Sequence, residues 1–231
     1  MARPTKNDKI PNLAEAIKNS AWDQISKNGA AALSLRAIAR DLGITAPAIY
    51  NHFQRRDDLV TALIVDAYTS LGKSQQTAIE NLPVLDIEGR FTALGTAYRE
   101  WAITYPQRYQ LIFGTPIPKY EAPENITLPA ATEALVPLLE TFQAFSDENR
   151  LRLDQVNPLT VELEAMLTAW QAVAEGIALE VLYAVLVTWS RVHGLVSMEI
   201  GNHFPSYITD PSEVFKQEIQ NLLIQYLLEE A

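Results

Sequence analysis

The feature that most constrains this chain is the run from Leu35 to Phe53, whose spacings suit two short helices that cross steeply around one tight turn. Ala39 is a small residue at the expected crossing, Gly43 can adopt a positive φ at the turn, and Ile49 is an apolar residue that faces inward. Each residue type meets a different steric demand. The run therefore predicts a helix-turn-helix.

Both helices of this motif have start signals. Ser34 precedes the first helix and Thr45 the second, and a hydroxyl at either position can accept a hydrogen bond from an unpaired N–H of the opening turn. Pro47 falls in the first turn of the second helix, where a missing N–H costs little. We therefore expect side-chain caps at Ser34 and Thr45.

The second helix of the motif has a leading edge of small residues, which would let it approach base edges closely. Polar side chains that can donate to phosphates or bases follow this edge. The candidate contacts on this helix are Ala46, Pro47, Ala48, Tyr50, Asn51 and His52. An ordinary packing helix is the alternative, but such a helix would not present so small and polar a face.

The net charge of −10 is unevenly distributed along the chain. Residues 1–60 carry nine Lys and Arg against six Asp and Glu, whereas residues 61–231 carry nine against twenty-two. The positive surplus therefore lies only where the motif lies. Because salt screens charges over about 8 Å, an acidic body held away from a duplex need not abolish DNA binding.

The chain contains no cysteine, which excludes disulfides, thiolate metal sites and thiol nucleophiles. The first residues lack the apolar segment of a signal peptide, and no uncharged apolar run reaches about 18 residues. We therefore expect a cytoplasmic protein with no membrane partner.

Helical periodicity continues to the end of the chain, and the alternation and turn pairs of a sheet are missing after Pro83. We expect an all-α fold, with an N-terminal three-helix bundle that contains the helix-turn-helix and a larger helical C-terminal domain. A long Pro-rich and Gly-rich loop is expected at 114–129. Outside the motif, the expected helices cover about 12–27, 54–80, 86–104, 106–113, 130–145, 159–175, 177–202 and 211–229.

The last two helices, 177–202 and 211–229, are apolar on more than one side, so each needs packing partners on both sides. A second copy of the chain would supply the second partner and form a four-helix dimer interface. Packing within one chain is the alternative.

Aromatic residues are frequent in the middle helices, with a spacing that is also typical of a core. Rings with polar edges line many ligand cavities, so we expect an aromatic-walled pocket there. The candidate pocket residues are Tyr98, Trp101, Tyr105, Tyr109, Phe113, Trp170, Trp189 and His193.

A metal-dependent enzyme and a protein-interaction module are the two alternatives to DNA binding. A metal-dependent helical enzyme would rest on Glu199 and His203, which lie four residues apart, but a catalytic zinc usually needs three protein ligands. A helical protein-interaction module is less consistent with the small, polar tip of the second motif helix. We therefore expect no catalytic residues, no metal and no cofactor.

The whole chain resembles the tetracycline-repressor (TetR) type transcriptional regulators. The strongest part of this resemblance is Leu35 to Leu59, where Gly-Ile-Thr-Ala-Pro-Ala-Ile-Tyr-Asn-His-Phe is similar to that family's recognition helix. A second part, Tyr98 to Gly114 together with Trp189 to Gly194, is similar to a subgroup with a Trp-His-Gly signature in its C-terminal domain.

The resemblance implies a ligand-responsive repressor that binds a near-palindromic operator as a homodimer. It implies a DNA-binding domain at 11–58 and a domain for small-molecule binding and dimerisation at 59–231. The polar residues 1–10 are expected to form a flexible arm. The implied DNA contacts are Arg36, Thr45, Ala46, Pro47, Ala48, Tyr50, Asn51, His52 and Arg56.

The chain departs from the family where a Pro and a Ser often follow the Phe, because Gln54 and Arg55 stand there instead. The next helix thereby lacks its usual hydroxyl cap. Two alternatives stay open: Asp58 reaches back to the amides of the first turn, or Arg55 contacts a phosphate.

Overall fold

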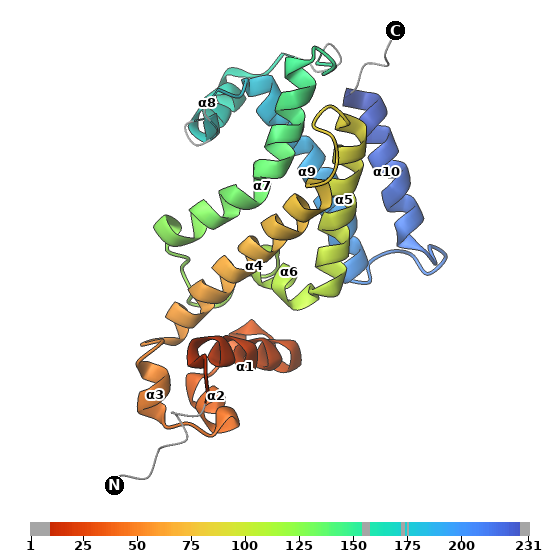
Figure 1. The fold of residues 1–231 in the computed structure, drawn as a ribbon. Helices are drawn as coiled ribbons and strands as arrows, with labels where there is room; N and C mark the ends of the chain where they lie inside the picture. The colour runs from red at the N-terminus through yellow and green to blue at the C-terminus, as the bar shows by residue number, and fades with distance from the viewer. Residues whose placement is uncertain (1–9, 154–157, 172–173, 175, 227–231) are drawn as a thin grey trace. The chain divides into compact units, whose positions relative to one another are not determined.

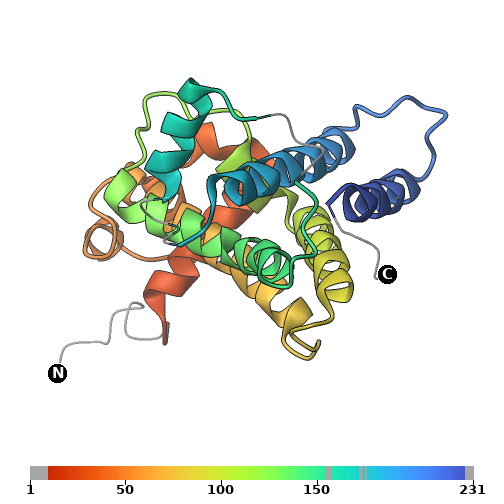
Figure 2. The same ribbon diagram turned by 90° about the horizontal axis from the view of Figure 1, so that it is seen from above.

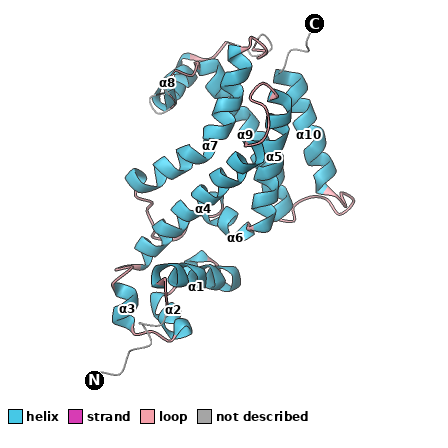
Figure 3. Cartoon of the chain, viewed as in Figure 1, coloured by secondary structure: helices cyan, strands magenta, loops and turns pink. Residues whose placement is uncertain are grey.

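The computed structural model describes residues 10–153, 158–171, 174 and 176–226. In chain order (Figures 1 and 2), the elements are α1 (Leu13–Asn28), the 3-10 helix η2 (Ala30–Ala32), α2 (Leu35–Leu42), α3 (Ala46–Tyr50), α4 (Arg56–Ile79), α5 (Ile87–Thr104), α6 (Pro106–Phe113), α7 (Glu124–Asp147), α8 (Val161–Gln171), α9 (Leu179–Ile200) and α10 (Pro211–Tyr226). No β-strand occurs among the described residues (Figure 3), which confirms the predicted all-α class. Most of the expected arm, residues 1–9, lies outside the described residues.

The chain divides into two compact units that do not follow chain order. Unit 1 contains residues 1–69 and 105–131, and unit 2 contains residues 70–104 and 132–231. Consequently α4 and α7 each contribute one segment to each unit, and α6 belongs to the same unit as α1, α2 and α3. The domain boundary between residues 58 and 59 stays a prediction.

The core of unit 1 lies between α1, α2, α3 and the first turns of α4. The apolar face of α1 buries Ile17, Ala21 and Ile25, and the Oδ1 atom of Asn12 accepts a hydrogen bond from the Glu15 N–H at 3.2 Å. The remaining members of this buried cluster are Leu33, Leu35, Ile38, Ala39, Ile49, Leu59, Val60, Leu63 and Ile64. The expected three-helix bundle therefore forms around one apolar core.

The helix-turn-helix has the steric features that the sequence predicts. Gly43 adopts φ 62° and ψ 32°, in the left-handed region that Gly enters without the penalty of a Cβ. Ala39 is 4% exposed and Ile49 is fully buried. The Ser34 Oγ accepts from the Ala37 N–H at 3.4 Å, which confirms the predicted cap of α2.

The predicted side-chain cap at Thr45 is wrong. Thr45 does precede α3, but its hydroxyl makes no capping hydrogen bond. A cap hydroxyl accepts from the second or third residue of a helix, and here the second is Pro47, which has no N–H. The third, Ala48, donates its N–H to the Thr45 carbonyl oxygen instead, at 3.0 Å.

The predicted loop at 114–129 is too long, because α7 already begins at Glu124. The Pro123 carbonyl accepts from the N–H groups of Ile126 and Thr127, at 2.9 and 3.0 Å, and so starts the helix. Pro129 removes one hydrogen bond from the second turn, yet the helix continues because Thr127 and Ala130 are buried on its inner face. Burial overrides the local breaker signal.

In unit 2, α9 is the central helix and packs against α5, α8 and α10 (Figures 1 and 2). By length and composition it is the one described helix that could cross a membrane, a test that core helices of soluble proteins also pass. Its Arg191 and Glu199 make ion pairs with Glu218 of α10 and Arg99 of α5. The residues that α9 buries against its neighbours are Val181, Leu182, Ala184, Val185, Thr188, Val192 and Val196, as in a core helix.

We expect Gly43→Ala to lower the free energy of unfolding by about 1–2 kcal/mol, because a Cβ at positive φ meets the carbonyl oxygen. The matched control is Gly194→Ala in α9, where an added Cβ meets nothing within 4 Å. That control should change stability by less than about 1 kcal/mol, in the stabilising direction. Urea unfolding followed by circular dichroism measures both, and an equal effect of the two substitutions would contradict the role of Gly43.

Candidate nucleic-acid interface

The face that α2 and α3 present to solvent contains most of the residues predicted to contact DNA. Tyr50 at the end of α3 is 39% exposed, and Asn51 and His52 follow it directly. The exposed members of the predicted set are Arg36, Thr45, Ala46, Pro47, Tyr50, Asn51 and His52. Their side chains combine one fixed positive charge with hydroxyl, amide and imidazole donors, which suits phosphate and base-edge contacts.

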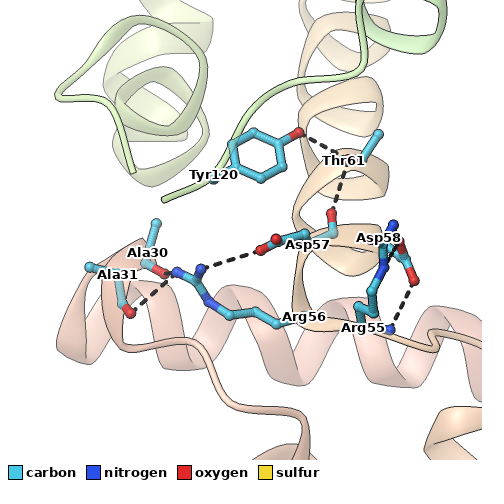
Figure 4. A network of polar contacts seen from close by, with 8 residues as sticks. All are labelled: Ala30, Ala31, Arg55, Arg56, Asp57, Asp58, Thr61 and Tyr120. Carbon is cyan, nitrogen blue, oxygen red and sulfur yellow. Dashed lines mark hydrogen bonds and ion pairs between the residues drawn. The ribbon is translucent and has the colours of Figure 1, made fainter. Parts of the chain in front are cut away.

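Two predicted contact residues have roles inside unit 1. Ala48 is only 6% exposed, so its methyl group packs among the helices. The Arg56 guanidinium lies against η2, where Nη2 donates to the carbonyl oxygens of Ala30 and Ala31 at 2.9 and 3.2 Å (Figure 4). Its Nη1 pairs with the Asp57 carboxylate at 3.4 Å. Whether either residue also contacts DNA stays a prediction.

The start of α4 shows how the chain replaces the missing hydroxyl cap. The Asp58 Oδ2 accepts a hydrogen bond from the Arg55 N–H at 2.8 Å, and Oδ1 accepts from the Arg55 guanidinium at 2.8 Å (Figure 4). Of the two alternatives, the structure therefore contains the first, in which Asp58 reaches back to cap the helix. The hydrogen bond from the Arg55 side chain is the main reason why the pKa of Asp58 is lowered.

A polar contact that the sequence did not predict joins the segment between α6 and α7 to α4. The hydroxyls of Tyr120 and Thr61 lie 2.9 Å apart, and the Thr61 hydroxyl also donates to the Asp57 carbonyl oxygen at 2.9 Å (Figure 4). The sequence indicated this contact only indirectly, through the long loop predicted at 114–129, because long loops in compact domains are often functional. Nothing in the local sequence indicates that Tyr120 reaches Thr61, 59 residues away.

Helix α6 also contacts α1 in unit 1. Gln107 Nε2 donates to the Ser26 Oγ at 3.3 Å. The Arg108 guanidinium lies 5.4 Å from the centre of the Trp22 ring and 4.7 Å from that of Tyr105, within the range of cation–π contacts. The segment 105–131 is therefore attached to the helix-turn-helix bundle at α1 as well as at α4.

The eight residues predicted to line an aromatic pocket are divided between the two compact units. Tyr105, Tyr109 and Phe113 belong to unit 1, and the other five belong to unit 2. Tyr105 is 41% exposed, whereas Tyr109 is buried and its ring centre lies 5.2 Å from that of Phe113. Their role in ligand binding stays a prediction.

In unit 2, Tyr98 and His193 form a polar contact between α5 and α9. The Tyr98 hydroxyl lies 2.9 Å from His193 Nδ1, and the Trp189 ring packs beside the imidazole at 5.3 Å between centres. Trp101 donates its Nε1–H to the Ser70 Oγ at 3.0 Å, and Trp170 is half-buried. Burial lowers the pKa of His193, so its neutral form is favoured at neutral pH. The Trp-His-Gly subgroup stays a prediction.

A hollow of about 530 Å³ lies within unit 1, between the first part of α4, the end of α6 and the start of α7. It contains none of the eight predicted pocket residues. Its walls are mainly aliphatic and aromatic, with a few hydroxyl groups. The lining residues are Ile64, Tyr68, Leu111, Ile112, Gly114, Thr115, Pro116, Ile117, Tyr120, Ala122, Glu124, Thr127, Leu128 and Ala131.

The residues weighed for a metal-dependent enzyme have other contacts. The Glu199 carboxylate accepts from Arg99 Nε at 2.7 Å, as part of an ion pair between α9 and α5. Within the described part of the chain, no three His, Asp or Glu side chains gather in a way that could hold a metal ion.

Comparison with known proteins identifies both parts of the chain. Residues 17–63 match the family model "Bacterial regulatory proteins, tetR family", and residues 91–222 match "Tetracyclin repressor-like, C-terminal domain". The HTH-type transcriptional regulator Rv1816 of Mycobacterium tuberculosis is 32% identical over 210 residues, which cover 89% of this chain and 88% of that protein.

Solved structures agree with this assignment. The crystal structure of SCO4313 is similar with a TM-score of 0.76 and 33% identity, over 96% of this chain and 99% of that one. The complex of SmeT with triclosan has the same fold, with a TM-score of 0.64 and 13% identity, over 94% of this chain and 92% of that one.

We expect Arg56→Gln to lower the free energy of unfolding by about 1–3 kcal/mol, because the carbonyl groups of Ala30 and Ala31 lose a charged donor. The control, Arg36→Gln, removes an exposed guanidinium of α2 and should change stability by less than about 0.5 kcal/mol. Urea unfolding distinguishes the two variants. Unchanged stability of Arg56→Gln would mean that the contacts with η2 contribute nothing to folding.

Proposed function

This chain belongs to the tetR family of bacterial transcriptional regulators with a DNA-binding helix-turn-helix, and we propose that it is a cytoplasmic repressor that binds a near-palindromic operator as a homodimer and releases it when a small molecule binds. The observation that carries this proposal is the exposed face of α2 and α3, where Tyr50, Asn51 and His52 lie beside the small residues of α3. Its relatives are named as regulators, which supports a function other than catalysis.

Within this proposal, the exposed residues have distinct roles. Arg36, Tyr50 and His52 contact phosphates and set the register of the protein on the duplex. The small side chains of Ala46 and Pro47 allow α3 to approach base edges in the major groove. Thr45 and Asn51 supply further hydrogen bonds at the two ends of α3. Arg56 supports this face by holding η2, to whose carbonyl groups it donates. Ala48 supports it because its buried methyl group packs where the helices cross.

Dimerisation would place two copies of α3 about 34–36 Å apart, one helical turn of DNA, which explains the expected near-palindrome. The proposed interface is formed by α9 and α10. Between these helices runs a groove in which Leu195 and Val214 lie among polar side chains, and Ile224 of α10 is 69% exposed. The polar lining residues are Arg191, Glu213, Gln217, Glu218 and Asn221. Apolar side chains exposed on the last helices are typical of an isologous interface.

The response to a small molecule would couple two sites through α4, which contributes residues to both units. SmeT, which has the same fold, was solved in complex with triclosan. A change of about 100-fold in operator affinity corresponds to about 2.7 kcal/mol, within the usual range of allosteric coupling. A rearrangement of the first turns of α4 would be sufficient to change the orientation of α3.

Selection of bound fragments from a genomic DNA library tests the proposal and defines the operator. With that operator, Tyr50→Phe should weaken binding by about two- to tenfold, because one hydrogen bond to the duplex is lost. Arg36→Gln should weaken binding to all sequences and reduce the slope of log affinity against log salt by about 0.9. The control is Tyr207→Phe, at a tyrosine of unit 2 that is 79% exposed. Operator affinities equal to wild type would remove Arg36 and Tyr50 from the interface.

The proposed dimer predicts a mass of twice 25.8 kDa in multi-angle light scattering. Ile224→Glu should shift the protein towards the monomer, because a charge would be buried without a partner. Leu85→Glu, at a residue that is 67% exposed between α4 and α5, should leave the mass unchanged. A monomeric wild-type protein at working concentration would contradict the interface.

A further inference from the structure

We infer that the hollow of unit 1 is a binding site for a small, largely apolar and uncharged molecule. We infer further that the Tyr120–Thr61 hydrogen bond couples binding of this molecule to the first turns of α4. The transmission step rests on the proposed function, because it concerns the control of DNA binding. The binding step does not, because it follows from the chemistry of the hollow. The site lies in the same compact unit as the helix-turn-helix.

The size and walls of the hollow fit a small molecule. Its volume of about 530 Å³ lies within the range of about 300–1,000 Å³ that is typical of ligand sites. Ile64 at its inner wall is 7% exposed, so the hollow reaches the core of unit 1. Aliphatic and aromatic side chains from α4, α6, α7 and the segment between α6 and α7 line it, and their burial by a ligand would be the main driving force.

The polar groups of the hollow indicate an uncharged ligand. Among the described residues, no Lys or Arg lines it, so a carboxylate or phosphate would lose its hydration without gaining a counter-charge. Glu124, a charged residue of the lining, is exposed to solvent. Burial raises the pKa of Tyr68, so its phenol stays protonated at neutral pH. This hydroxyl makes no hydrogen bond with the described residues and is available to one polar group of a ligand.

Tyr120 connects the hollow to α4. It lines the hollow, and its hydroxyl lies 2.9 Å from that of Thr61. A hydroxyl has a single proton, and the Thr61 proton is donated to the Asp57 carbonyl oxygen, so Tyr120 is the donor in its contact with Thr61. A ligand with a hydrogen-bond acceptor near Tyr120 would compete for the same proton. Binding would then free Thr61 and loosen the segment between α6 and α7.

The same turn of α4 also supports the segment that leads into α2. Asp57 pairs with Arg56, whose guanidinium donates to the Ala30 and Ala31 carbonyls of η2 (Figure 4). Thr61 and Arg56 therefore attach two different segments to the first turns of one helix. A change at Tyr120 acts on the turn that positions η2, within one compact unit.

The aromatic residues of unit 2 are a weaker candidate for a ligand-binding site than the hollow of unit 1. Tyr98 and Trp101 are 4% and 3% exposed, and their polar atoms contact His193 and Ser70. Buried rings with satisfied polar atoms are typical of a core. The hollow in unit 1 instead combines open volume with an available phenol.

Binding is tested with the uncharged fluorophore N-phenyl-1-naphthylamine, titrated into the full-length protein without DNA. Wild type should bind it with an increase in fluorescence. Ala131→Phe places a ring in the hollow and should weaken binding by about tenfold or more. The control Ala165→Phe, at an exposed position of α8, should bind as wild type does. Circular dichroism verifies folding, and Ala122→Trp, at the exposed side of the hollow, replaces Ala131→Phe if that variant unfolds.

The titration has clear contrary outcomes. If wild type does not enhance the fluorescence, or if the filled variant binds as tightly as wild type, the hollow is not the site. Loss of binding in the control as well would place the fluorophore elsewhere, and would also overturn the inference.

Transmission is tested by operator affinity in a double-mutant cycle. Tyr120→Phe and Thr61→Val should each weaken operator binding by about two- to tenfold, and the double variant should be no weaker than the weaker single variant. Additive effects, or affinities equal to wild type, would overturn the transmission step. If wild type selects no DNA at all, the proposed function fails together with transmission, and the fluorophore titration alone decides the binding site.

Discussion

The first turns of α4 hold the contacts on which the arrangement of unit 1 depends. Arg56 donates to the carbonyl groups of η2, Asp58 caps the helix through the Arg55 N–H, and Thr61 accepts from Tyr120. Each contact attaches a different segment to the same helix. Because charged hydrogen bonds are stronger than neutral ones, the contact of Arg56 with η2 is stronger than the contact of Tyr120 with Thr61.

Arginine side chains make different kinds of contact in the two units. The positive surplus of residues 1–60 includes Arg36, which is exposed on α2, whereas Arg55 and Arg56 are paired with neighbouring carboxylates. In unit 2, Arg99 and Arg191 join α9 to α5 and α10 through ion pairs. Fewer positive side chains are therefore free for phosphates than the sequence count suggests, so the proposed DNA contacts depend more on the hydroxyl of Tyr50 and the imidazole of His52.

The proposed ligand site offers a physical basis for switching DNA binding. A repressor needs a state that binds DNA and a state that does not, and a ligand can shift between them only by its differential affinity. The Tyr120–Thr61 contact offers such a difference, because one hydrogen bond is made in the empty hollow and exchanged in the filled one. The free energy of exchanging one hydrogen bond is small, yet a modest coupling free energy is enough to shift a repressor between its two states.

Local sequence alone determined the helix-turn-helix, because Ala39, Gly43 and Ile49 answer steric demands that arise within a few residues. It also predicted the ends of most helices, whereas it left the cap by Asp58 as one of two open alternatives, and the hydrogen bond from the Arg55 N–H is seen only in the structure. It could not predict the start of α7, where burial of Thr127 and Ala130 outweighs Pro129. The predicted Thr45 cap is wrong for a local reason, because Pro47 has no N–H to donate. Only tertiary structure decided that the predicted aromatic residues divide between two units and that Tyr120 meets Thr61. Such contacts depend on how distant helices pack, and periodicity within one helix does not contain that information.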